Sequence, residues 1–111
     1  MEYQIKSRIW IEKENRVFLG EGRVKMLKAI DKYGSITKAS KQLNISYKKA
    51  WRLINAVNST ASQPVTMNSV GGKGGGGVIL TPYGKKLVKA FDQINRNCWD
   101  FLDNQLKNLN D

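Results

Sequence analysis

Residues 34–58, GSITKASKQLNISYKKAWRLINAVN, decide the fold, because they have the pattern of two helices joined by a short turn. Ala39 is small enough to let two helices cross closely, and a larger side chain there would push them apart. Leu43 ends the first helix, and Asn44 and Ile45 supply the turn. The segment therefore predicts a helix-turn-helix.

The second of these helices has two chemically different faces. Apolar side chains occupy one face, at Ala50, Ile54 and Val57. Polar side chains occupy the other face, at Tyr47, Lys48, Arg52 and Asn55. A helix that enters the major groove of duplex DNA is built in this way, because its apolar stripe holds it on the protein while its polar stripe meets the bases.

The positive charge of the chain is concentrated around the same segment. The 111 residues carry a net charge of +10, and residues 23–64 alone hold nine basic side chains and one acidic side chain. A basic protein suits an anionic membrane or a nucleic acid, and charge focused on one motif favours the nucleic acid. We therefore expect double-stranded DNA as the partner, and no membrane partner.

The composition argues against several other classes of protein. Histidine is absent from the sequence, and the one cysteine has no activating neighbour, so we expect no enzyme activity, no metal site and no cofactor. The single cysteine, Cys98, excludes an internal disulfide and fits a reducing cytosol. No apolar run approaches ~18 residues, and the N-terminus lacks a secretory pattern, so we expect a cytoplasmic, nucleoid-associated protein.

The other segments complete a single α+β domain over residues 1–111, a winged helix-turn-helix. An N-terminal β-hairpin is expected within residues 1–20, since residues 3–12 alternate in polarity and residues 17–19 are apolar. Tyr3, Trp10 and Phe18 are expected to be packing residues. The remaining parts are a three-helix core over residues 21–58, a wing over residues 65–80 and a dimerisation helix over residues 81–110.

The last of these helices carries an apolar seam that repeats in steps of three and four. The seam consists of Leu87, Phe91, Ile94, Cys98, Phe101 and Leu102. Such residues are either core or interface, and we favour a dimer interface because the helix is longer than so small a domain needs to cover itself. Cys98 is expected to be a small buried apolar residue rather than a redox switch.

Candidate DNA-binding residues fall into two groups. Phosphate contacts are expected from Thr37 and Lys38 at the start of the first motif helix, and from Lys41. The second helix is expected to reach base edges through Ser46, Tyr47, Lys48 and Arg52, with Asn55 on the same stripe and Lys49 on the DNA backbone. A bidentate pair between Arg52 and a guanine would contribute ~1–3 kcal/mol of discrimination. Trp51 lies either beneath the wing or at a base, and we favour the core position.

Residues 71–77, GGKGGGG, form a glycine tract between the two expected wing strands. The tract is not a nucleotide-binding phosphate loop, because its spacing fails and no Ser or Thr follows Lys73. It is either a loop without function or the tip of a wing. We favour the wing tip, since glycines let backbone amides approach a phosphate or the minor groove while Lys73 adds charge.

Three stretches resemble the DNA-binding domain of ModE-type molybdenum-dependent transcriptional regulators. They are GEGR, AID and GSI within residues 20–36, ISYKKAW at residues 45–51, and GGKGGGG followed by Leu80, Thr81 and Gly84. The helix-turn-helix is also similar to that of LysR-type regulators. The resemblance covers essentially the whole chain, and it implies a winged-helix, dimeric DNA-binding protein.

Regulators of this type usually also carry C-terminal oxyanion-binding domains, whereas this chain stops at Asp111. We therefore expect no molybdate binding by this chain. Two functions remain in view. The favoured one is a sequence-specific transcriptional regulator, a homodimer on a pseudo-palindromic operator, and the alternative is a sequence-tolerant architectural DNA-binding protein.

Overall fold

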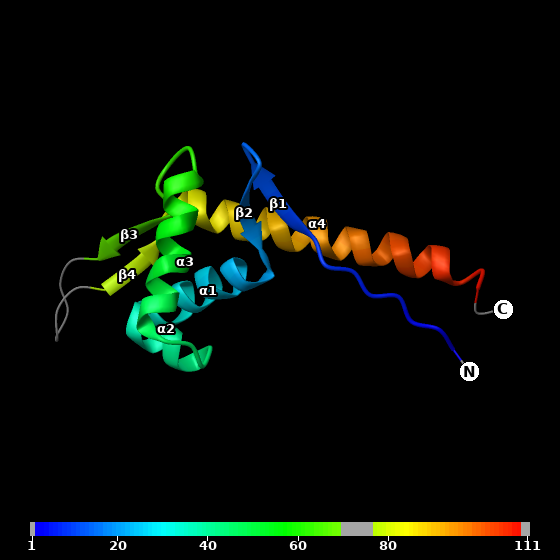
Figure 1. Ribbon diagram of the computed structural model, residues 1–111, viewed down its shortest axis with the longest axis horizontal. Helices are drawn as coiled ribbons and strands as arrows, with labels where there is room; N and C mark the ends of the chain where they lie inside the picture. Colours follow the sequence, from blue (N-terminus) through cyan, green and yellow to red (C-terminus); the bar gives the residue numbers. More distant parts are fainter. Residues whose placement is uncertain (1, 70–76, 110–111) are drawn as a thin grey trace.

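The computed structural model describes residues 2–69 and 77–109. The elements follow one another as β1 (Trp10–Lys13), β2 (Arg16–Gly20), α1 (Glu21–Tyr33), α2 (Ile36–Gln42), α3 (Tyr47–Thr60), β3 (Thr66–Ser69), β4 (Gly77–Leu80) and α4 (Pro82–Leu106), as Figure 1 shows. We call the β3–β4 hairpin the wing. The predicted α+β order is confirmed: an N-terminal hairpin, three helices, a second hairpin and a long C-terminal helix.

The N-terminal hairpin is shorter than the alternation in the sequence predicted. Glu14 and Asn15 turn the chain with φ angles of 53° and 63°, as expected for a tight turn. The strand begins at Trp10, so the prediction of a strand over residues 3–9 was wrong. The physical reason is that β2 has five residues and can pair with only the last part of the alternating stretch.

Two of the three expected packing residues in this region are at the surface. Phe18 is buried at 7% exposure, but Tyr3 and Trp10 are 60% and 54% exposed. Trp10 donates an indole hydrogen bond to Glu12 Oε2 at 2.9 Å, an interaction between two exposed side chains of β1. The hairpin therefore covers the core mainly with β2, and Ile11 of β1 packs against the edge of the core.

The core is built on one face of α1. Its buried side chains are Val24, Met26, Leu27, Ala29 and Ile30. Spacings of three and four place them on one side of the helix, and α2, α3, α4, β2 and β4 all contact α1. α1 begins at Glu21, the first residue of the expected three-helix core, so Gly22 lies in its first turn.

Local capping fixes the helix boundaries close to where the sequence placed them. Gly34 adopts a left-handed φ of 68° and donates its N–H to the Ile30 carbonyl at the end of α1. Ser35 Oγ accepts from the Lys38 N–H at 3.1 Å and starts α2. Asn44 turns the chain with a φ of 56°, and Ser46 Oγ accepts from the Lys49 N–H to start α3. The predicted helices and turn of residues 34–58 are therefore confirmed.

The wing is fastened to the helices by backbone contacts at its base. Val78 N–H donates to the Gly34 carbonyl at 3.0 Å, and Thr81 N–H donates to the Val65 carbonyl at 3.0 Å. Thr81 Oγ1 also accepts from the Gly84 N–H, which caps α4 with Pro82 at its first position. The backbone of α4 approaches the base of β3 so closely that a Cβ on Gly84 would lie 2.2 Å from the Val65 carbonyl oxygen.

α4 extends well past the core. Its 25 residues correspond to about 37 Å of helix, and the described chain measures 58 × 31 × 22 Å. In Figure 1 the distal half of α4 leaves the core and is accompanied by the N-terminal segment. None of the helices in the described parts of the chain is long and apolar enough to cross a membrane.

We predict opposite effects for the same substitution at two glycines. Gly84→Ala places a methyl group against the fixed Val65 carbonyl and should lower the free energy of unfolding by about 1–3 kcal/mol. Gly22→Ala meets no atom within 4 Å, so its stability should be unchanged or raised by up to about 1 kcal/mol. Urea denaturation followed by circular dichroism compares the two. Equal stability of both variants would contradict the close contact.

Candidate nucleic-acid interface

The buried face of α3 sets which of its side chains reach solvent. Ala50 is fully buried, and Ile54 and Val57 are 6% and 1% exposed. Ala39 of α2 is also fully buried, as expected for a small residue at a close helix crossing. The opposite side of α3, together with the start of α2, therefore forms a continuous outer surface.

Every candidate DNA-contact residue that the structure describes lies on this outer surface and is exposed. They are Thr37, Lys38, Lys41, Ser46, Tyr47, Lys48, Lys49, Arg52 and Asn55. Lys73, the tenth candidate, lies outside the described residues. We call the nine described residues, together with Trp51, the α2–α3 face.

The α2–α3 face is strongly positive and is not neutralised from within the chain. Residues 34–60 contain five basic side chains and no acidic one. In the described ranges the ion pairs join Glu21 to Arg8 and Lys25, and Lys28 to Asp92. None of these pairs includes a residue of α2 or α3, so the cations of the face remain available to an anionic partner.

Trp51 corrects one expectation, because it does not lie in the core. Its side chain is 49% exposed, while the neighbouring position Ala50 takes the buried place on α3. Steps of four put Tyr47, Trp51 and Asn55 in one row along the helix. Trp51 and Asn55 line a notch of about 150 Å³ whose other wall is the wing, at Asn68 and Val78.

Asn58 joins α3 to the wing and was not identified from the sequence. Its Oδ1 accepts from the backbone N–H groups of Val65 (2.7 Å) and Thr66 (3.3 Å). Its Nδ2 donates to Thr66 Oγ1 at 2.9 Å. One side chain thus fixes the root of β3 against the last turn of α3. Nothing in the local sequence signals this role, since both partners lie beyond an irregular connection.

The apolar seam of α4 divides into an inner and an outer part. Phe91 is 3% exposed and Leu87 packs against the core of its own protomer. These two candidates for the dimer interface are therefore core residues. Ile94 and Phe101 are 49% and 62% exposed. Cys98 and Leu102 are half-buried, and Cys98 Sγ lies 3.9 Å from Ser7 Oγ.

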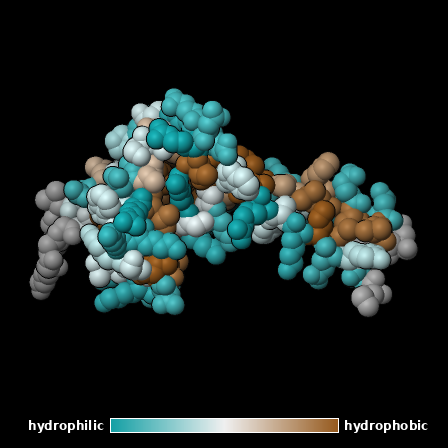
Figure 2. All heavy atoms as spheres, viewed as in Figure 1, coloured by the Kyte–Doolittle hydropathy of each residue, from teal (hydrophilic) through white to brown (hydrophobic). Residues whose placement is uncertain are grey.

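The distal half of α4 also exposes an aromatic residue that the seam did not include. Trp99 is 51% exposed and lines a hollow with Ile5 and Asp103, where the N-terminal segment runs beside the helix. Figure 2 shows hydrophobic residues gathered over this end of the molecule, away from the core. Apolar side chains of α4 and of the N-terminal segment therefore lie close together at this end of the molecule.

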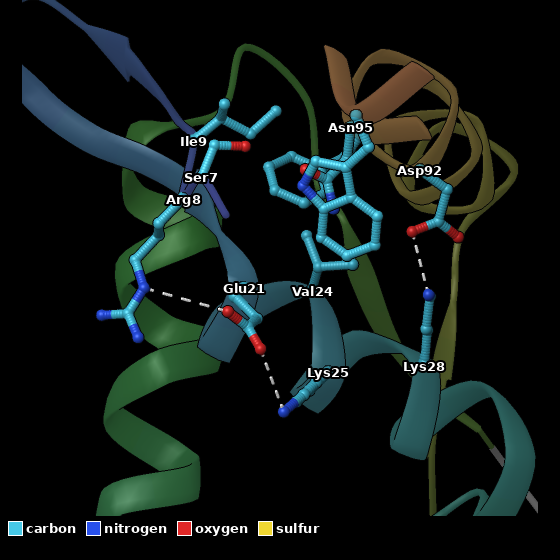
Figure 3. Close-up of a pocket in the computed structure, with 11 residues that line it drawn as sticks. Ser7, Arg8, Ile9, Glu21, Val24, Lys25, Lys28, Asp92 and Asn95 are labelled. Atoms are coloured by element: carbon cyan, nitrogen blue, oxygen red, sulfur yellow. Dashed lines mark ion pairs between the residues drawn. The ribbon is translucent and has the colours of Figure 1, made fainter. Parts of the chain in front are cut away.

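A separate small cavity of about 130 Å³ lies between the N-terminal segment, α1 and α4. Figure 3 shows charged side chains around it pointing toward one another. Glu21 pairs with Lys25 at 3.2 Å and with Arg8 at 4.0 Å, and Lys28 Nζ lies 2.9 Å from Asp92 Oδ1. The Lys28–Asp92 pair links α1 to α4, and within the described chain no buried side-chain nitrogen or oxygen is left without a hydrogen bond. The ion pairs around the cavity thus hold these elements together, and we assign the cavity no binding role.

Curated proteins similar to this chain include ModE proteins and molybdenum-pterin-binding proteins. The DNA-binding transcriptional dual regulator ModE of Escherichia coli K12 is 35% identical over 102 residues, 89% of this chain and 39% of that protein. Molybdenum transport protein ModE of Azotobacter vinelandii is 32% identical over 105 residues, 95% of this chain and 39% of that protein. Molybdenum-pterin-binding protein MopB of Rhodobacter capsulatus is 40% identical over 92 residues, 83% of this chain and 34% of that protein. No family model matches the chain.

By homology the chain corresponds to the N-terminal region of ModE-type regulators. The resemblance inferred from the three sequence stretches is confirmed. This ModE-like chain spans between about a third and two-fifths of the length of the relatives named above. Those relatives are named as regulators, a transport protein and a pterin-binding protein, and none is named as an enzyme.

We predict that Asn58→Ala loosens the wing. The substitution leaves the amides of Val65 and Thr66 without an acceptor, which should cost about 1–3 kcal/mol of unfolding free energy. Amide hydrogen exchange should quicken at those two residues first. Asn55→Ala, one turn earlier and exposed, is the matched control and should leave exchange at both amides unchanged. If the Asn58 variant keeps wild-type protection there, its role as the anchor is refuted.

Proposed function

We propose that this chain is the DNA-binding unit of a sequence-specific transcriptional regulator, a dimeric winged helix-turn-helix. The observation that carries the proposal is the α2–α3 face. Nine described residues expected to contact DNA are all exposed on it, and its five cations have no acidic neighbour within residues 34–60. Homology to the N-terminal region of ModE regulators supports the same assignment.

In this proposal α3 enters the major groove and α2 lies across the phosphate backbone. Lys38 and Lys41 contribute charge that displaces counterions, which provides affinity without sequence preference. Arg52 points from the exposed stripe of α3 and can make two parallel hydrogen bonds to a guanine. The wing, held against α3 by Asn58, rests beside the groove that α3 occupies.

We propose that two copies of the chain form a homodimer through the outer part of α4. Ile94 and Phe101 are exposed and Leu102 is half-buried, so these residues present an apolar strip that the described part of the protomer covers only in part. Pairing two copies through this strip removes the apolar area from water, at about 25 cal/mol per Å². Two α3 helices would then meet successive major grooves about 34 Å apart on a pseudo-palindromic operator.

The alternative is a sequence-tolerant architectural protein, which shares the positive charge but has no use for a polar stripe on α3. We favour the regulator because Tyr47, Arg52 and Asn55 present three different side-chain chemistries to one groove. MopA and MopB are named for molybdenum-pterin binding, and the chain spans 28% and 34% of their lengths. A ligand of that kind is not part of the proposal.

Arg52→Ala tests whether the chain discriminates between sequences. The preferred duplex is first obtained by in vitro selection, and fluorescence anisotropy then compares it with a scrambled duplex. Loss of a bidentate guanine contact should reduce the preference by roughly tenfold to hundredfold. Arg96→Ala removes the same charge from the exposed surface of α4 and should keep the preference. If the wild-type chain binds both duplexes equally within a few-fold, the architectural alternative is correct.

Ile94→Asp tests the dimer. A carboxylate in an apolar strip must be desolvated on association, so the dimer dissociation constant should rise at least about tenfold. Gln93→Asp adds the same charge next to it, about 100° around the helix, and should leave the constant unchanged. Sedimentation equilibrium measures both variants. A wild-type chain that stays monomeric at every concentration would exclude this interface.

A further inference from the structure

Trp51 has a position that neither core packing nor phosphate binding explains. Its indole is 49% exposed on the flank of α3 that meets the wing, in one row with Tyr47 and Asn55. The buried positions next to it on α3 are taken by Ala50 and Ile54. An indole cannot neutralise a phosphate, so this part of the face has a chemistry different from that of the surrounding cations.

The structure gives the indole a defined setting. Trp51 forms one wall of the notch of about 150 Å³, and Asn68 and Val78 of the wing form the opposite wall. Asn58 holds these walls together through its bonds to Val65 and Thr66. A group that enters the notch therefore meets an aromatic surface on one side and a β-strand on the other.

The chemistry of the major groove identifies the group that fits. Thymine alone among the four bases presents a methyl group there, and apolar side chains recognise it by direct contact. The other base edges present donors and acceptors, which Arg52, Tyr47 and Asn55 can satisfy. The apolar indole of Trp51, between the polar side chains of Tyr47 and Asn55, is thus complementary to thymine alone among the four bases.

We infer that Trp51 is a specificity-determining residue that selects thymine by contact with its C5 methyl group. The inference rests on the proposed function, since it requires α3 to lie in the major groove. It adds a base preference to that function, a thymine in each half-site at the position that faces the notch. Because Tyr47 and Asn55 lie in the same row of α3, the thymine falls within the segment that these residues contact.

Deoxyuridine provides a probe that removes the methyl group and nothing else. In the duplex obtained by selection, each thymine is replaced in turn by deoxyuridine, symmetrically in both half-sites, and dissociation constants are measured by anisotropy. Burial of one methyl group corresponds to roughly fourfold in affinity for each half-site. The wild-type chain should lose about that factor at one symmetric pair of positions.

The variant proteins assign the effect to Trp51. Trp51→Ala should bind the thymine and deoxyuridine duplexes equally at that position, while Trp51→Phe should keep most of the discrimination. Tyr47→Ala, in the same row, is the matched control and should retain the methyl effect at the Trp51 position. Thermal melting of each variant checks that the fold is intact. If Trp51 only supported the wing, its loss would weaken both duplexes equally and leave the ratio unchanged.

The outcomes separate this inference from the proposed function. If selection yields a preferred duplex but no thymine is sensitive to loss of its methyl group, the Trp51 inference is wrong and sequence-specific binding stands. A Trp51→Ala variant that remains as sensitive as the wild type would exclude the inference in the same way. If selection yields no preferred duplex at all, the proposed function itself fails.

Discussion

The burial of one face of α1 is the constraint on which the rest of the structure depends. Met26 and Ile30 are fully buried and Leu27 is 1% exposed, and full burial of each such side chain contributes about 1.5–3 kcal/mol. Because α2, α3, α4 and both hairpins come against this helix, their orientations are set by it. A helix is a rigid cylinder, so fixing the apolar stripe of α3 on the core also fixes the direction of Arg52 and Trp51.

The second constraint is the attachment of the wing. Asn58 secures the root of β3, the Thr81 N–H bonds to the Val65 carbonyl, and Val78 N–H bonds to Gly34 at the end of α1. These bonds join the wing to three different helices. α3 and the wing should therefore present one preformed surface to a ligand, which reduces the entropy lost on binding.

Local rules predicted the central part of this fold well. Gly34, Ser35, Ser46 and Thr81 cap their helices, and capping depends on residues only a few positions away. The exposed candidates of α2 and α3 could likewise be predicted from helical periodicity. Their binding partner could not, because it is absent from the chain itself.

The mistaken and missed assignments mostly concern contacts between distant parts of the sequence. Alternation over residues 3–9 indicates a strand, but pairing depends on the length of β2. Trp51 is hydrophobic enough for the core, yet Ala50 already occupies the buried place on α3. The role of Asn58 depends on where β3 returns, which no local pattern specifies.

The seam of α4 shows how one periodic pattern can serve two purposes. Phe91 is buried within the protomer, whereas Leu102, eleven residues further along on the same side of the helix, is only half-buried. The change occurs because the core ends while the helix continues. α4 begins at the base of the wing and runs unbroken to the exposed strip, so it is a rigid connection between the two. In a dimer formed through that strip, the geometry of α4 would set the distance between the two copies of α3, and hence the spacing of half-sites that the pair can occupy.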